Sequence, residues 1–192
     1  NRAANIYNAL FYSRNADQLH QEFIDAVFHT EPPMSAAEQK EAFENALSGA
    51  LEDECLMDVV QSVHEQLREK IEQHKESRNP EPLAVTARDV GGILQTCGIA
   101  QERLDAFQVR CDEYFGENAA LNPSNLIDSK RFEVKTPEIT ITISPECSYL
   151  VETCVIDGRK YLLIPAGEGV EINGLAVGLR DGREKQMESG SI

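Results

Sequence analysis

The sequence predicts an α+β protein in which a helical region of about five helices precedes a small antiparallel β-sheet. Up to residue 129, apolar residues recur at intervals of three and four, which is the spacing of one buried helix face. From Arg131 onward the period falls to two, and Asp157-Gly158 and Asn173-Gly174 interrupt the alternation. We therefore divide the chain into a helical region over 1–129, a β-domain over 130–179 and a disordered tail over 180–192.

The first part of the helical region, residues 1–79, begins with two helices separated by a proline pair. Asn15 can cap a helix that runs to about His29, and Pro32-Pro33 then stops it. Ser35 and Glu38 have the spacing of a capping box, which predicts that a second helix starts there. The apolar stripe of that second helix comprises Phe43, Ala46, Leu47, Ala50 and Leu51.

A third, longer helix is expected to follow. The acids Glu52, Asp53 and Glu54 would stabilise its start, because carboxylates interact favourably with the positive end of the helix dipole. Its apolar stripe comprises Leu56, Val59, Val60, Val63, Leu67 and Ile71.

Residues 83–116 read as a helical hairpin. Thr86 and Asp89 form a second cap, with Val85 and Val90 as the flanking hydrophobic pair. Gly98 is expected to end the first helix in a left-handed conformation, and Gly116 ends the second helix, which runs from about Gln101 to Phe115. The inward-facing positions are Val90, Ile93, Leu94 and Cys97 in the first helix, and Leu104, Phe107, Cys111 and Tyr114 in the second.

Gly91-Gly92 lies inside the first helix of this hairpin, where glycine is unfavourable. We expect the compensating gain to be the close approach of a neighbouring helix. A phosphate-binding role is disfavoured, because these glycines do not precede the first turn of a helix.

The β-domain is predicted from one alternating strand and two hairpins. Residues 139–143 read Ile-Thr-Ile-Thr-Ile, the pattern of a half-buried strand. Residues 149–156 and 159–164 flank Asp157-Gly158, and residues 169–172 and 175–179 flank Asn173-Gly174. Asp-Gly and Asn-Gly favour the positive φ angles of a type I′ turn, so each pair of segments is expected to form a hairpin.

Composition excludes several classes of protein. The net charge is −15, and residues 1–129 carry 10 basic and 23 acidic residues. A field of that sign repels nucleic-acid phosphates and anionic lipid surfaces. No apolar run approaches the roughly 18 residues of a membrane span. The five cysteines, Cys55, Cys97, Cys111, Cys147 and Cys154, are odd in number and form no Cys-x-x-Cys motif, so we expect free thiols in a reducing cytoplasm.

No catalytic residue, cofactor-binding residue or metal ligand can be assigned from the sequence. None of His20, His29, His64 and His74 lies three or four residues from another His or Cys, so solvated helix histidines are expected. His64-Glu65 begins like the zinc-protease helix motif, but Arg68 stands where the second ligand would be. No nucleophile elbow, phosphate-binding loop or dinucleotide fingerprint occurs.

The helical pair over 86–115 has the outline of a helix-turn-helix, which leaves nucleic-acid binding as one hypothesis. Its second helix carries the acids Glu102, Asp105, Asp112 and Glu113 against the bases Arg103 and Arg110. Such a helix would repel phosphates, so a structural helical hairpin is favoured over a DNA-reading one.

Several runs, in the same order along the chain, resemble the C-terminal half of DUF4317, a bacterial domain of unknown function. These runs lie at residues 5–10, 22–28, 30–34, 64–67, 74–77, 80–82, 151–153, 155–158 and 169–174. Ala100 departs from the family pattern, in which a serine cap is expected. The resemblance implies a cytoplasmic protein of anaerobic, often gut-dwelling bacteria. It implies that an N-terminal half is missing here, and it implies no activity.

Three functional hypotheses follow. The leading one is a non-catalytic protein-interaction or scaffold module of a longer cytosolic protein, which binds another protein or self-associates through exposed hairpin edges. The second is part of an enzyme whose active site is completed by the missing N-terminal half. The third is nucleic-acid association through 86–115, which the acidic charge disfavours.

Overall fold

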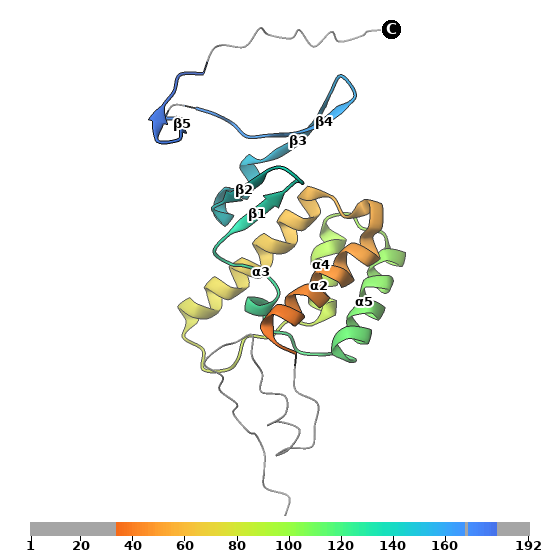
Figure 1. Ribbon diagram of the computed structural model, residues 1–192. Coiled ribbons are helices and arrows are strands. Elements are labelled where there is room, and N and C mark those ends of the chain that lie inside the picture. The colour runs from red at the N-terminus through yellow and green to blue at the C-terminus, as the bar shows by residue number, and fades with distance from the viewer. Residues whose placement is uncertain (1–33, 168, 180–192) are drawn as a thin grey trace, which may run out of the picture. The chain divides into compact units, whose positions relative to one another are not determined.

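A computed structural model describes residues 34–167 and 169–179 of the chain (Figure 1). The predicted helix over 15–29 and the predicted tail over 180–192 lie outside the described residues. Helices come first and two-stranded antiparallel sheets follow, so the α+β class is confirmed. The chain divides into two compact units, residues 1–148 and residues 149–192.

The first unit is built on four α-helices within the described residues. They are α2 (Ala36–Leu51), α3 (Met57–Ser77), α4 (Ala87–Thr96) and α5 (Gln101–Phe115). Helix α5 packs against both α2 and α4, and α3 packs against α4 (Figure 1). A short 3-10 helix, η2 (Pro123–Asn125), follows α5 and contacts α2 and α3.

The helix starts and stops follow local sequence signals. Ser35 and Thr86 each form a complete capping box, with Glu38 and Asp89 respectively, as predicted. These boxes satisfy amide groups that the helix itself leaves unpaired. Gly98 has a φ of +84° and terminates α4 in the left-handed region, also as predicted.

The core of the first unit is centred on Phe107 of α5, whose side chain is fully buried. Phe43 of α2 meets it edge to face, with ring centroids 6.2 Å apart and an interplanar angle of 80°. The predicted stripe of α3 is buried at four positions, but Leu56 and Val60 are exposed, as is Tyr114 of α5. The buried α3 residues are Val59, Val63, Leu67 and Ile71.

The expectation that the three acids open the long helix is wrong. Glu52, with a φ of +49°, ends α2, and residues 52–54 form a separate 3-10 helix, η1 (Glu52–Glu54). Arg103 of α5 lies 2.9 Å from the Glu52 carboxylate, 3.3 Å from Asp53 and 3.9 Å from Glu54. The acids therefore interact with a guanidinium, and α3 begins only at Met57, after an extended Leu56.

The β-structure consists of three separate two-stranded antiparallel sheets. Strand β1 (Phe132–Lys135) pairs with β2 (Thr140–Ile143), and this pair belongs to the first unit. The unit boundary falls after Ser148, not at the predicted residue 129, because Phe132 is buried and its ring packs on His64 of α3. A 3-10 helix, η3 (Pro145–Leu150), follows β2.

The second unit contains the two predicted hairpins. Strand β3 (Glu152–Ile156) pairs with β4 (Arg159–Leu163), and β5 (Glu171–Ile172) pairs with β6 (Leu175–Ala176). Both turns have positive φ at both central residues: +50° and +75° at Asp157-Gly158, and +53° and +78° at Asn173-Gly174. These angles confirm the predicted type I′ turns.

The prediction that a neighbouring helix closely approaches Gly91-Gly92 is wrong. A Cβ atom built on either glycine would meet nothing within 4 Å. The glycine that does allow a close contact is Gly49 of α2, where a Cβ would lie 2.8 Å from the Arg110 guanidinium. Local sequence did not reveal that contact, because Arg110 lies on α5, remote from Gly49 in the chain.

We therefore expect Gly92→Ala to stabilise the protein by about 0.5–1 kcal/mol, since alanine favours a helix interior and the added methyl group has open space. Gly98→Ala is the matched control, and it should destabilise by roughly 1–2 kcal/mol because φ there is left-handed. Urea unfolding of both variants measures the two changes. A destabilised Gly92→Ala would show that a neighbour contacts this position after all.

Candidate functional site

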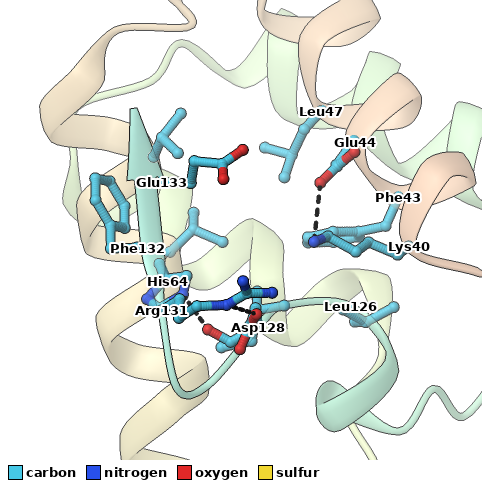
Figure 2. A pocket seen from close by; sticks show the side chains of 13 residues that line it. Lys40, Phe43, Glu44, Leu47, His64, Leu126, Asp128, Arg131, Phe132 and Glu133 are labelled. Atoms are coloured by element: carbon cyan, nitrogen blue, oxygen red, sulfur yellow. Dashed lines mark hydrogen bonds and ion pairs between the residues drawn. The ribbon is translucent and has the colours of Figure 1, made fainter. Parts of the chain in front are cut away.

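The first unit contains a cleft of about 310 Å³ between α2, α3 and the segment that leads into β1 (Figure 2). Its floor is apolar, and charged side chains surround the floor. Figure 2 shows Lys40 and Glu44 of α2 on one side and His64 and Arg131 on the other. The apolar residues are Phe43, Leu47, Val60, Val63, Leu126, Ile127 and Phe132, and the charged rim is completed by Asp128 and Glu133.

His64 is held in this cleft by a hydrogen bond and a ring contact. Its Nε2 lies 2.9 Å from the carbonyl oxygen of Asp128, and its ring meets Phe132 edge to face at 5.3 Å. Because a carbonyl oxygen can only accept, Nε2 must carry the proton. Burial lowers the pKa of His64 below 6.5, against the opposing effect of the Asp128 hydrogen bond. The expectation of a solvated histidine is therefore wrong at this position.

Four of the other rim charges form two ion pairs, Asp128 with Arg131 and Lys40 with Glu44. The Asp128 carboxylate accepts hydrogen bonds from the Lys130 amide and from Arg131 Nε, both at 3.0 Å. The amide bond and the guanidinium hold the pKa of Asp128 below its usual range. Lys40 Nζ lies 3.9 Å from the Glu44 carboxylate. The cleft thus offers an apolar surface beside two ion pairs, with Glu133 as a further acid on its rim.

The chemistry available in the cleft is limited. None of its lining residues is a Ser, Thr, Cys or Tyr that could act as a nucleophile. The His64 hydrogen bond is to a backbone carbonyl, so no carboxylate orients this ring as a general base. The lining residues can receive an apolar group, but they do not form a recognisable catalytic constellation.

A second, more open groove of about 580 Å³ lies along α4 and α5. Gly91 and Gly92 line it, together with polar residues that include Asp105 and Asp112. Both acids accept hydrogen bonds from glutamines one helical turn earlier, at 2.8 and 3.0 Å. The groove is therefore polar and mostly acidic.

The positive charges of α5 face away from this groove. Arg103 engages the acids of η1, and the Arg110 guanidinium lies over Gly49 of α2. Both arginines of the helix that would have to read DNA thus contact other segments of the protein. This arrangement further disfavours phosphate binding by the helical pair.

No metal or thiol chemistry is evident in the part of the chain that the structure describes. Within residues 34–167 and 169–179, no group of three His, Cys, Asp or Glu residues is placed to hold a metal ion. All five cysteines are free. Burial raises the pKa of Cys111 to about 12 and also raises that of Cys55, so neither thiol is activated. None of the helices described here is both long and apolar enough to cross a membrane.

The cleft could not be found from sequence, since its two sides come from distant segments. His64 and Asp128 are joined by a hydrogen bond across 64 positions of sequence. The available signal was that His64 directly follows the stripe residue Val63, so it borders the buried face of α3. No residue of the cleft was predicted as a site residue.

These features define an α+β protein with a closed helical core and β-hairpins of small size. Residues 1–175 match the family Domain of unknown function (DUF4317), and the chain belongs to this family. The match spans essentially the whole chain and does not single out a C-terminal half. No curated protein and no solved structure matches the chain significantly. The family description states no activity, so function must be inferred from the structure.

The half-buried His64 generates a pH dependence of stability with a defined sign. Because its folded pKa lies below 6.5, the unfolded chain binds the proton more readily. Stability should therefore fall as pH drops from 6.5 toward the folded pKa. The amide of a glutamine can still donate a hydrogen bond to Asp128. We therefore expect His64→Gln to lose this part of the dependence of stability on pH. Urea unfolding across this range, with NMR titration of the His64 ring, provides the test. An imidazole that titrates at or above 6.5 would contradict it.

Proposed function

We propose that this chain is a non-catalytic protein-interaction module that binds its partner through the β3–β4 hairpin. The observation that carries the proposal is the exposure of large apolar side chains on that hairpin. Val155 is 65% exposed, and Tyr161, Leu163 and Ile156 are 42%, 40% and 36% exposed. Val155 lies on one face of the hairpin and the other three residues lie on the opposite face, so both faces expose apolar side chains, which is typical of protein-binding surfaces.

The energetics of small β-structures support the same proposal. An isolated two-stranded hairpin is marginally stable in water, because it has no second layer against which to bury its side chains. Within the described residues, β3 and β4 pair only with each other. A partner that adds strands or covers one face would supply the missing burial.

The first unit fits the role of a scaffold for this hairpin. Its four helices enclose a shared apolar core, and its acidic surface favours solubility. The cleft beside His64 shows no constellation that would favour an enzyme. We place the protein in the bacterial cytoplasm, on the basis of five free cysteines and the resemblance to a bacterial family.

The proposal is tested by co-purification with an affinity-tagged chain and an untagged copy expressed in the same cells. We expect Val155→Lys to reduce the recovered partner at least about tenfold, since a lysine on a strand edge opposes pairing. Val109→Lys is the matched control, because Val109 on α5 is 56% exposed but lies outside the hairpin. It should leave recovery unchanged.

Two outcomes would overturn the proposal. One is that neither another protein nor the untagged copy is recovered with the natural chain. The other is that Val155→Lys and Val109→Lys reduce recovery equally, which would place the interaction away from the hairpin.

A further inference from the structure

The two edges of the β3–β4 hairpin differ in charge. Strand β4 begins with Arg159 and Lys160, and cations on an edge strand discourage pairing with another strand. Strand β3 reads Glu-Thr-Cys-Val-Ile and carries no cation. The edge formed by β3 is therefore the one open to strand addition.

The tight turn determines which backbone groups face that open edge. Ile156 and Arg159 flank the two-residue turn, so they form a hydrogen-bonded pair within the hairpin. By the alternation of an antiparallel ladder, Cys154 is also bonded to β4, whereas Thr153 and Val155 are not. The N–H and C=O groups of Thr153 and Val155 therefore point outward from the edge.

From this geometry, and resting on the proposed function, we propose that the partner is a second copy of this chain. Strand β3 of one copy pairs antiparallel with β3 of the other, about a two-fold axis at Cys154. Thr153 of each copy then lies opposite Val155 of the other, and the two residues exchange the outward hydrogen bonds. The two hairpins become one four-stranded sheet in which every outward group of these residues is satisfied.

The charges of the hairpin are complementary in this register. Cross-strand partners share a face, so Glu152, Cys154 and Ile156 lie on the same face as Arg159 and Tyr161. In the paired sheet, Glu152 of one copy lies opposite Ile156 of the other copy. Ile156 is paired with Arg159 of its own hairpin, so that Arg159 lies one strand further along the same cross-strand row. This Glu and Arg are about 9.6 Å apart at the backbone, two strand spacings, which their long side chains can span.

The same register places apolar side chains at the centre of that face. The middle row contains Cys154 and Tyr161 of both copies, flanked by a Glu–Arg pair on either side. Pairing through β4 instead would place Arg159 opposite Leu163 and Lys160 opposite Leu162. It would keep the same Glu–Arg separation of two strand spacings, but it would place two cations of each copy along the new interface. The cations of β4 therefore favour the β3 edge, and the Glu–Arg spacing fits a second copy of this chain.

Light scattering coupled to size exclusion tests the proposal on the full chain, with an expected mass twice that of one copy. Val155→Pro removes an outward N–H and no bond within the hairpin, so it should weaken the dimer at least about tenfold. Lys160→Pro is the matched control, because it makes the same change on the outer edge of β4. It should leave the dimer intact.

Oxidative cross-linking gives a second readout that does not depend on a disruptive variant. Non-hydrogen-bonded cross-strand partners have Cα atoms about 4.5 Å apart, within the range that a disulfide bridges. Added copper phenanthroline and oxygen should therefore join the two Cys154 thiols, taking two electrons and two protons from them. We expect a covalent dimer from the natural chain and none from Cys154→Ser. Tyr161→Cys in that Cys154→Ser background should also give none, since it reports on pairing through β4.

The outcomes separate this proposal from the proposed function. If the natural chain is a monomer that binds another protein, and Val155→Pro loses that protein, self-pairing is overturned and the proposal of an interaction module stands. A monomer that recovers no protein overturns both. A dimer that resists Val155→Pro, or that cross-links through Tyr161→Cys, overturns the β3 register.

Discussion

The burial of the helical apolar stripes around Phe107 is the constraint on which the rest of the first unit depends. Phe107 is fully buried and meets Phe43 across the interface of α5 and α2. Burying such side chains is the dominant favourable contribution to folding, of about 25 cal/mol per Å² of apolar area. The break between α2 and α3 accommodates this packing: it ends one helix at Glu52, and Arg103 pairs with the acids exposed there.

Features set by neighbouring residues were predictable from the sequence. The capping boxes at Ser35 and Thr86, the left-handed Gly98 and the two type I′ turns depend on residues at most three positions apart. The main core positions of α2, α4 and α5 followed from helical periodicity for the same reason. Local chemistry therefore predicted the order and type of the elements.

Features set by distant residues were not predictable. The favourable interaction of acids with a helix dipole led us to assign residues 52–54 to a helix start, because their partner Arg103 lies about fifty residues away and could not be foreseen. The cleft needs His64 and Asp128 together, and their hydrogen bond joins segments with no shared sequence pattern. Periodicity identified hairpins, but it could not show whether hairpins join one another, and the structure forms three separate sheets.

The two units differ in how completely they bury their apolar residues. In the first unit, four helices close around a common core, and four rim charges of its cleft form two ion pairs. In the second, the β3–β4 hairpin leaves Val155, Tyr161 and Leu163 exposed. The interaction proposal follows from this contrast, because the helices share a buried apolar core whereas the large apolar side chains of the β3–β4 hairpin are exposed.

Hydrogen exchange measured at low and high protein concentration tests this contrast most directly. The account predicts that α2–α5 amides are protected at both concentrations. It predicts that the outward amides of Thr153 and Val155 gain protection only as concentration rises. Concentration-independent exchange at these two positions, whether fast or slow, would contradict the account.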